Sequence, residues 1–329
     1  MITRRKLVIA LGCGALLAPL SSFAQQQSAK VFRIGFLGAG TPEREGKRLA
    51  IMAARLAELG WKDGVNVKLD INWGQNDPAR YRELAMALAA NKPALLVVPR
   101  DTEAKIAFPL MGSVPILFAS GFDPIGSGLV KSLARPGGTV TGISSQNREL
   151  SAKRLGLLKE AVPRLTRVGA LLRTGDANAL RWLQDTTDQG KARGIQVIAA
   201  PVGRREDLVP AFESMAKQHV GAVMNIADGL FFETRRELAE LSLKHRMASI
   251  GGVPEFADDG ALLSYAPDVS VAWKQIAGFV DRILKGANPA DMPVEQLNIY
   301  ELVVNMKTAK ALGIKIPNSI LVQATRVIE

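Results

Sequence analysis

The side chains that most often carry out catalysis are scarce in this sequence. The chain has 329 residues, with one cysteine, Cys13, and two histidines, His219 and His245. Neither histidine has a further metal-type residue beside it, so a zinc site has no support. Each one follows a predicted helix, where the helix dipole favours a cation. The sequence therefore predicts no catalytic residue, no metal and no cofactor.

Paired carboxylates are the remaining candidates for acid-base chemistry. Asp258 and Asp259 are adjacent, but they lie in an Ala-Asp-Asp-Gly stretch that is typical of a turn. The glycines at 35–40 do not complete the Gly-x-Gly-x-x-Gly pattern of a dinucleotide site. A carboxylate-dependent hydrolase or isomerase that uses Asp228 or Glu255 stays open as an alternative.

Residues suited to holding a small molecule are more frequent, and they follow apolar runs that are typical of β-strands. In an open parallel sheet a ligand lies beyond the carboxyl ends of the strands, where loops lead into helices. The candidate ligand-binding residues at such positions are Thr41, Pro42, Arg100, Thr102, Ser120, Gly121, Phe122, Thr174, Asp176, Asn178, Asp228, Glu255 and Phe256.

These candidates offer three kinds of contact. The helix N-termini after Thr41 and Thr102 present unpaired N–H groups that suit a carboxylate, and Arg100 adds a bidentate donor. The carboxylates that suit an ammonium group or a ligand hydroxyl are Asp176, Asp228 and Glu255. The aromatic rings that could stack on a ligand ring are Phe122, Phe231 and Phe256.

Structural roles stay open for several of the same residues. Helix capping alone would explain Thr41, Thr102 and Asp228. Arg100 and its neighbour Asp101 can pair with each other on the surface. Two further assignments are structural: Phe231 and Phe232 begin a predicted helix and favour the core, and Asp123 before Pro124 favours a turn.

The elements that position these residues are strands alternating with helices. Apolar runs predict the strands, and amphipathic stretches predict the helices between them. In the first part of the chain the strands are 31–37, 65–73, 94–98 and 114–118, and the helices are 42–59, 77–90 and 103–110. This order predicts an α/β fold with parallel sheets covered on both faces.

The same order of elements returns in the second part of the chain. Arg-Ile-Gly-Phe-Leu at 33–37 is echoed by Arg-Val-Gly-Ala-Leu at 167–171. The later strands that match the first series are 195–199, 221–225 and 248–250, and the matching helices are 205–218 and 230–244. Two βαβ-type lobes of similar plan are therefore predicted.

Several crossings between these lobes are expected. A strand at 139–143 and a helix at 150–161 form the first crossover, a helix at 269–285 returns to the first lobe, and a strand at 301–305 returns to the second. The predicted first lobe is 31–144 with about 267–296, and the second is 145–266 with about 297–329. A multi-strand hinge of this kind suits closure around a ligand.

The N-terminus has the order of a secretory signal. Basic residues at 4–6 precede an apolar run at 7–20, and Ser-Phe-Ala at 22–24 offers a cleavage site near Ala24. Cleavage there predicts residues 1–24 as a signal peptide, a periplasmic location and a mature chain without cysteine. Alternatives are a twin-arginine route, a retained anchor, or a lipoprotein site at Cys13.

The charge balance is basic, with a formal net charge of +11. No run of basic residues alternates with aromatic residues as a nucleic-acid groove would require, so no nucleic-acid partner is expected. We interpret the basic residues as solvated helix faces. Examples are Arg44, Lys47, Arg48, Arg80, Arg82, Arg235 and Arg236.

Specific strings in the second and last thirds of the chain resemble a known family. These strings are FDPIGSGLV (122–130), LARPGG (133–138), ELSAKRL (149–155), LKEAVP (158–163), MPVEQ (292–296) and ELVVNMKTAKALG (301–313). They resemble a bacterial ABC-transporter substrate-binding family that includes aromatic-amino-acid binders. The resemblance extends over the whole mature chain.

This resemblance implies a type I periplasmic-binding-protein fold with a small-molecule ligand in the cleft between two lobes. It also implies an ABC permease and its ATPase as partners, membrane contact only through the permease, and a monomer. A sensory binding protein that docks on a membrane receptor is the alternative within the same fold. One departure concerns the loop after the third strand, where many relatives carry a small neutral turn and this chain has Arg100 and Asp101.

Overall fold

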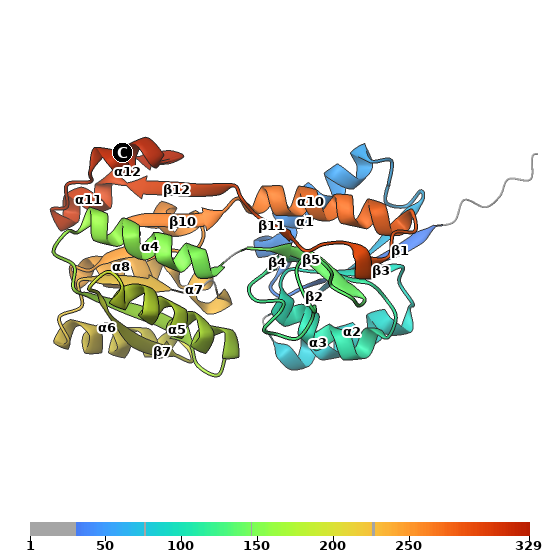
Figure 1. The fold of residues 1–329 in the computed structure, drawn as a ribbon, viewed down its shortest axis with the longest axis horizontal. Coiled ribbons are helices and arrows are strands. Elements are labelled where there is room, and N and C mark those ends of the chain that lie inside the picture. Colours follow the sequence, from blue (N-terminus) through green and yellow to red (C-terminus); the bar gives the residue numbers. More distant parts are fainter. Residues whose placement is uncertain (1–30, 76, 146, 226–227) are drawn as a thin grey trace, which may run out of the picture. The chain divides into compact units, whose positions relative to one another are not determined.

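The computed structural model describes residues 31–75, 77–145, 147–225 and 228–329. The expected signal peptide, its cleavage site near Ala24 and Cys13 lie outside the described residues. From Phe32 to Glu329 the chain forms one unit that contains two β-sheets (Figure 1). Within the described ranges, no helix combines the length and the apolar character needed to cross a bilayer.

The first sheet has six strands in the order β11-β5-β4-β3-β1-β2, and all neighbouring pairs are parallel. Its strands are β1 (Phe32–Gly38), β2 (Val67–Trp73), β3 (Leu95–Val98), β4 (Ile116–Gly121), β5 (Val140–Ser144) and β11 (Glu295–Gln296). Its helices are α1 (Pro42–Glu58), α2 (Pro78–Ala90), α3 (Asp101–Met111) and α10 (Val269–Leu284), with the short η2 (Pro289–Asp291). We call this sheet and its helices the first lobe.

Alternate residues of the first-lobe strands supply two separate cores. Along β1, Phe36 packs against α1 and α10, whereas the next residue, Leu37, packs against α2 and α3. Val97 and Val98 of β3 divide between the two cores in the same way. Because successive side chains of a strand point to opposite faces, a strand that is apolar throughout is buried on both sides.

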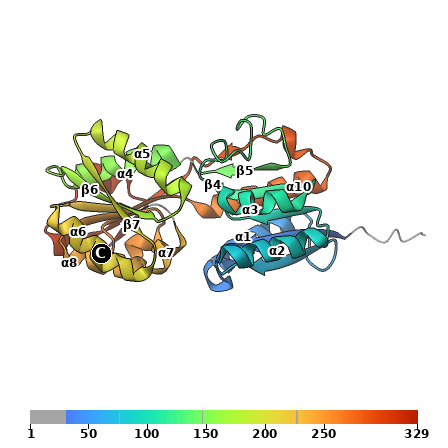
Figure 2. The same ribbon diagram turned by 90° about the horizontal axis from the view of Figure 1, so that it is seen from below.

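The second sheet has seven strands in the order β13-β12-β10-β9-β8-β6-β7. Its strands are β6 (Arg167–Arg173), β7 (Gln196–Val202), β8 (Ala222–Asn225), β9 (Ala248–Gly251), β10 (Leu263–Pro267), β12 (Tyr300–Asn305) and β13 (Arg326–Ile328). Its helices are α4 (Asn147–Ala161), α5 (Ala177–Lys191), η1 (Arg205–Asp207), α6 (Leu208–Lys217), α7 (Gly229–Glu233), α8 (Arg235–Lys244), α9 (Glu255–Asp258), α11 (Met306–Leu312) and α12 (Asn318–Gln323). We call this sheet and its helices the second lobe (Figures 1 and 2).

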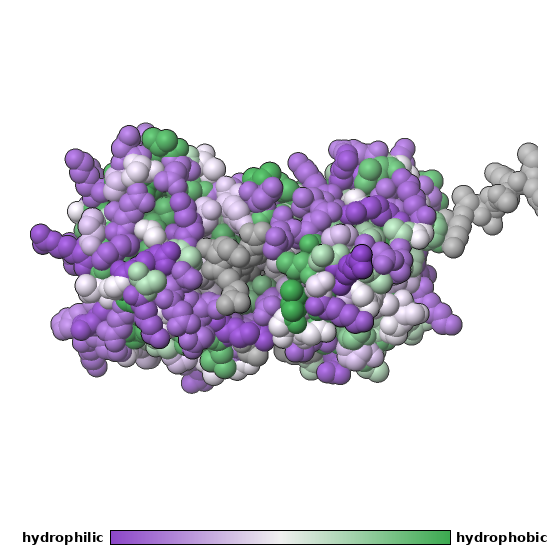
Figure 3. All heavy atoms as spheres, in the orientation of Figure 1, coloured by the Kyte–Doolittle hydropathy of each residue, from purple (hydrophilic) through white to green (hydrophobic). Residues whose placement is uncertain are grey.

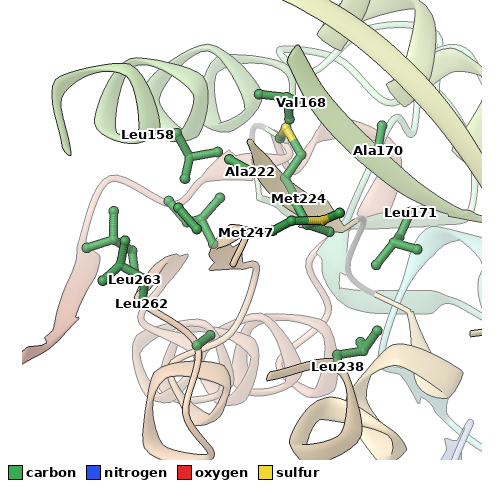
Figure 4. Packing of buried hydrophobic residues seen from close by; sticks show 14 of the residues in the cluster. Leu158, Val168, Ala170, Leu171, Ala222, Met224, Leu238, Met247, Leu262 and Leu263 are labelled. Carbon is green, nitrogen blue, oxygen red and sulfur yellow. The ribbon is translucent and has the colours of Figure 1, made fainter. Parts of the chain in front are cut away.

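The core of the second lobe lies where α4 and α8 meet the central strands. Figure 4 shows Leu158 of α4, Met224 of β8 and Leu238 of α8 in one cluster of buried side chains. Met247, one residue before β9, lies next to Met224 in the same view. Burying apolar side chains of this size is the main term that stabilises such a lobe.

The predicted α/β fold with two βαβ-type lobes is confirmed, with one correction to the sheets. The pair β10–β12 is antiparallel, with Leu263 opposite Val304 and Pro267 opposite Tyr300. The reason lies in the connectivity. Strand β10 leads out of the second lobe into α10, and β12 leads back in, so the two neighbours run in opposite directions.

The chain passes between the two sheets after β5, between β10 and α10, and between β11 and β12. Near the second of these crossings the buried side chain of Arg154 in α4 donates a hydrogen bond from Nε to the carbonyl of Tyr265, at 2.9 Å. Burial lowers the pKa of Arg154 to about 10. The exact residues at which the lobes divide remain a prediction.

Most of the face shown in Figure 3 is hydrophilic, and hydrophobic residues form small separate groups on it. Scattered apolar residues of this kind are normal on a soluble surface. This face therefore presents mainly hydrophilic residues to solvent.

Candidate functional site

A pocket of about 130 Å³ lies where the carboxyl ends of strands from both lobes face each other. Eight of the predicted residues line it: Arg100, Thr102, Ser120, Phe122, Asp176, Asn178, Asp228 and Phe256. They come from the ends of β3 and β4 in the first lobe, and from the segments after β6, β8 and β9 in the second. This position agrees with the rule for ligands in open parallel sheets.

Arg100 is held by a carboxylate of its own helix. Its Nη2 lies 2.5 Å from Glu103 Oε1, and its Nε donates to Glu103 Oε2 at 3.1 Å. The adjacent Glu103 carboxylate raises the pKa of Arg100 above its ordinary value, and Asp228 and Glu45 act in the same direction. The edge of the guanidinium formed by Nε and Nη2 is thus occupied by a carboxylate, so Arg100 is a weaker anion site than the sequence suggests.

Asp101 is fully buried and binds backbone groups instead of pairing with Arg100. Its Oδ2 accepts from the backbone N–H of Asp123 at 2.7 Å, and its Oδ1 accepts from that of Thr102 at 3.1 Å. Burial raises the pKa of Asp101, and the N–H groups of Phe122 and Asp123 partly oppose this. Asp101 therefore ties the end of β3 to the end of β4 and fixes one wall of the pocket.

The two second-lobe aspartates in the pocket are helix caps. Asp176 Oδ1 accepts from the N–H of Asn178 at the start of α5, and Asp228 Oδ1 accepts from the N–H of Leu230 at the start of α7, both at 2.8 Å. Each cap uses one carboxylate oxygen, so the second oxygen is available to a ligand. The structural and the binding interpretation of these residues are compatible.

Aromatic side chains form much of the apolar lining. Phe122 is half-buried and Phe256 is buried, and both were predicted. The pocket adds Phe232, which stacks under the guanidinium of Arg235 at 4.5 Å, and Trp273 of α10. Phe231 is fully buried in the second-lobe core, as its position at a helix start predicts. Its neighbour Phe232 reaches the pocket, so the core assignment is wrong for Phe232.

Five predicted residues do not line this pocket: Thr41, Pro42, Gly121, Thr174 and Glu255. Thr41 precedes α1 without a side-chain cap hydrogen bond, and Pro42 is the first residue of that helix. Gly121 ends β4, which is longer than predicted, and its carbonyl accepts from the N–H and Oγ of Ser145.

Thr174 and Glu255 belong to the second lobe. Thr174 is exposed and its N–H donates to the carbonyl of Val202. Glu255 begins α9 and lies near Glu301, whose pKa is raised mainly by burial and further by Asp268 and Glu255. The next residue, Phe256, is the one in this short helix that lines the pocket.

Thr102 is not a cap, because α3 begins at Asp101 and Arg100 occupies the cap position. Its hydroxyl instead donates to Glu103 Oε2 at 3.0 Å. Asp123 does shape its turn, as predicted, because its Oδ1 accepts from the N–H of Gly126 at 2.8 Å.

Glu45, Arg48 and Trp273 also line the pocket and are not among the predicted residues. Arg48 lines the pocket, although we interpreted it as part of a solvated helix face. A signal was present in the sequence, since Glu45 and Arg48 share the helical stripe of Met52 and Leu56, which are buried in the core. Charged residues that interrupt the apolar stripe in the first turns of a helix lie near the carboxyl end of the sheet that the helix covers.

Of the residues considered for catalysis, Asp228 lines this pocket, whereas the two histidines, the Asp258-Asp259 pair and Glu255 do not. His219 is exposed after α6, and His245 follows α8 as its C-cap and stacks on Phe212, with ring centroids 6.1 Å apart. Asp258 pairs with Arg326, and Asp259 pairs with Arg235 and Arg236. Across the described residues, no three His, Cys, Asp or Glu side chains form a group that could hold a metal ion.

Comparisons with known proteins agree with this geometry. A family model described as ABC transporter substrate binding protein matches residues 44–328. The chain is 25% identical over 261 residues to a protein named "Tyrosine-binding protein" from Clostridioides difficile (strain R20291), covering 79% of this chain and 74% of that protein.

Solved structures show the same fold. The ABC domain in complex with L-Trp from Streptococcus pneumonia is 26% identical, with a TM-score of 0.84, covering 91% of this chain and 100% of that chain. A conserved domain protein from Vibrio cholerae O1 biovar El Tor is 24% identical with a TM-score of 0.85, at the same coverage, and shows the fold alone. The chain therefore belongs to the family of ABC transporter substrate-binding proteins, and its function is to bind a solute.

Proposed function

We propose that the chain binds an amino acid with an aromatic side chain and delivers it to an ABC permease driven by its ATPase. The observation that carries this proposal is the combination, in one pocket, of carboxylates with aromatic rings. Asp176 and Asp228 each keep one oxygen for an ammonium group, while Phe122, Phe256 and Trp273 offer faces to a ring. Charge-assisted hydrogen bonds and ring packing are the two interactions that an aromatic amino acid needs.

Two relatives support the same class of ligand. One is named as a tyrosine-binding protein, and the other was solved with L-Trp. These names describe the two relatives. For this chain, the proposed class of ligand rests on the carboxylates and aromatic rings of its own pocket.

The proposal includes a location and a mode of action. The secretory pattern at residues 1–24 and the family support a periplasmic protein that meets the membrane only through its permease. The chain acts as a monomer, without a cofactor and without turnover. Its similarity to substrate-binding proteins over residues 44–328 supports this non-enzymatic role.

The test is a thermal-shift screen of the chain without residues 1–24 against the twenty amino acids and a set of aromatic acids and amines. A ligand that binds only the folded state raises the melting temperature by mass action. Tryptophan, tyrosine or phenylalanine should give the largest rise. If none of the three raises the melting temperature while another solute does, the proposed ligand class is wrong.

Asp228→Asn provides a sharper form of this test. Asparagine caps a helix as well as aspartate does, so the melting temperature without ligand should stay the same. The affinity for the amino acid should fall by about 10-fold or more, because a charged hydrogen-bond partner is lost. Asp188→Asn on the exposed face of α5 is the matched control and should change neither quantity. Product formation from a bound solute would contradict the non-enzymatic role.

A further inference from the structure

We infer that Arg48 is the residue that binds the acid group of the ligand and selects for acids over the corresponding amines. This inference rests on the proposed function and names a specificity residue for the same pocket. Two arginines line the pocket, Arg48 from α1 and Arg100 before α3. The question is which of the two guanidinium groups is available to an anion.

Arg100 is already neutralised. Glu103 occupies both its Nε and its Nη2, and Asp228 and Glu45 also act on its charge. A ligand carboxylate at Arg100 would have to approach against these three carboxylates. Since like charges repel strongly in a partly buried site, this position disfavours an anion.

Arg48 is in a different situation. Its side chain is half-buried in the pocket wall, and within the described residues its guanidinium has no ion pair and no hydrogen bond. A half-buried charge without a partner loses hydration and gains nothing in return. A ligand carboxylate would supply the missing partner through a bidentate pair of hydrogen bonds.

The nearby Glu45 does not take this place. A Cβ added to Gly38 at the end of β1 would lie 2.7 Å from Glu45 Oε2 and 2.4 Å from the ring of Trp73. The carboxylate of Glu45, which also lines the pocket, thus lies against the end of β1. Within the described residues no ion pair or hydrogen bond joins it to Arg48, one turn further along α1.

The two charged ends of an amino acid can then be assigned to the two lobes. Arg48 in the first lobe faces the acid group, and Asp176 and Asp228 in the second lobe face the ammonium group. The aromatic lining from Phe122, Phe256 and Trp273 remains for the side chain. An α-amino acid satisfies all three sets of residues, whereas an amine or an acid alone leaves one charged set without a partner.

The experiment compares L-tryptophan with tryptamine, which lacks the carboxylate, by titration calorimetry. Arg48→Gln should weaken tryptophan binding by about 10- to 100-fold and change tryptamine binding by less than about 2-fold. Arg48→Lys should restore most of the preference for the acid, since it keeps the charge. Arg55→Gln is the matched control on the same helix, where Arg55 pairs with Glu58 on the surface, and it should change neither affinity.

Asp228→Asn should show the opposite pattern and weaken both ligands, because both carry the ammonium group. If Arg48→Gln leaves the ratio of the two affinities unchanged, the assignment of Arg48 is wrong while the proposed function stands. If the unmodified chain binds neither tryptophan, tyrosine nor phenylalanine, the proposed function is wrong and this inference falls with it.

Discussion

Glu103 and Arg100 form an ion pair at the edge of the pocket in which the carboxylate is almost completely buried. The side chain of Glu103 is 8% exposed and that of Arg100 is 34% exposed. Burial alone would raise the pKa of Glu103, but the charge and hydrogen bonds of Arg100 outweigh it and the pKa is lowered. The pair therefore stabilises the folded state when Glu103 is ionised.

Glu103→Gln should lower the free energy of unfolding by about 2 kcal/mol at pH 7, because Arg100 keeps its charge and loses its partner. A folded-state pKa below the unfolded value gives stability that is complete above about pH 4.5 and is lost as the pH falls through the folded pKa. The difference between the two proteins should thus shrink below about pH 4. Urea denaturation between pH 7 and pH 3.5 measures it.

Glu58→Gln is the matched control for this prediction. Glu58 pairs with Arg55 at the same i,i+3 spacing, but the two side chains are 63% and 44% exposed. The control should cost less than about 0.5 kcal/mol. A loss for Glu103→Gln that is equally small, or that does not change with pH, would contradict the stabilising role of the pair.

Individual site residues could be predicted from the sequence where a strand leads directly into a helix cap. Asp176 and Asp228 are of this kind, and both line the pocket. Arg48 and Trp273 could not be found in this way, because they reach the pocket from helices whose packing on the sheet depends on distant segments. Trp273 is more than 200 residues from α1, yet α1 and α10 pack on each other.

Strands β4 and β5 approach each other unusually closely at one position. Gly142 in β5 has a φ of +151°, and a Cβ there would lie 2.1 Å from the carbonyl oxygen of Phe118 in β4. The register of the two strands shifts between Phe118 and Gly121. Only glycine fits this conformation and this approach without strain.

Gly142→Ala should therefore lower the free energy of unfolding by about 3 kcal/mol, since backbone atoms must move to admit the methyl group. Gly156→Ala is the control in the middle of α4, where an added Cβ meets nothing within 4 Å. That change should raise stability by about 0.5–1 kcal/mol, because alanine favours the helix. Urea denaturation of both variants measures the contrast, and equal stability would show that β5 can shift freely against β4.

The boundaries of elements were harder to predict than their order. The order of strands and helices follows from apolar periodicity, but the helix predicted at 230–244 is divided into α7 and α8 at Thr234, and the one predicted at 205–218 begins with the short η1. Helix α3 begins at Asp101, two residues before the predicted start. The reason is that the buried Asp101 carboxylate accepts from backbone N–H groups, including that of Asp123 after the end of β4. Strand β4 continues to Gly121 because β5 extends its pairing that far. Both extensions depend on partners that are not local in sequence.

At the scale of the whole molecule, the sequence predicts that the chain crosses between the lobes several times. It does not predict the side-chain contacts that join the lobes beside the pocket. Arg181 of α5 in the second lobe is such a contact. Its Nε lies 3.5 Å from Asp123 Oδ2, and its Nη1 donates to the carbonyl of Gly126 at 3.3 Å, both in the first lobe. The same side chain binds the side chain of Asn178, which lines the pocket. Arg181 thus links the first-lobe turn to the ligand-binding wall of the second lobe.

If ligand binding draws the lobes together, Arg181 should favour the closed arrangement without touching the ligand. Arg181→Gln should then weaken ligand binding by about 3- to 5-fold, because this is the size of effect expected from the loss of a half-exposed ion pair. Most of the change should be faster dissociation of the ligand. The melting temperature without ligand should stay within about 1 °C of the original. Lys191→Gln, which removes another surface pair from α5, is the control and should leave affinity unchanged.

Two measurements separate this role of Arg181 from general damage. Affinity should fall with added salt more steeply in the original chain than in Arg181→Gln, because only the former has the interlobe pair to screen. Small-angle scattering should show a smaller radius with ligand than without it in both proteins, since the hinge itself is intact. Scattering that is identical with and without a tight ligand would contradict closure, and an unchanged affinity in Arg181→Gln would show that the pair does not support it.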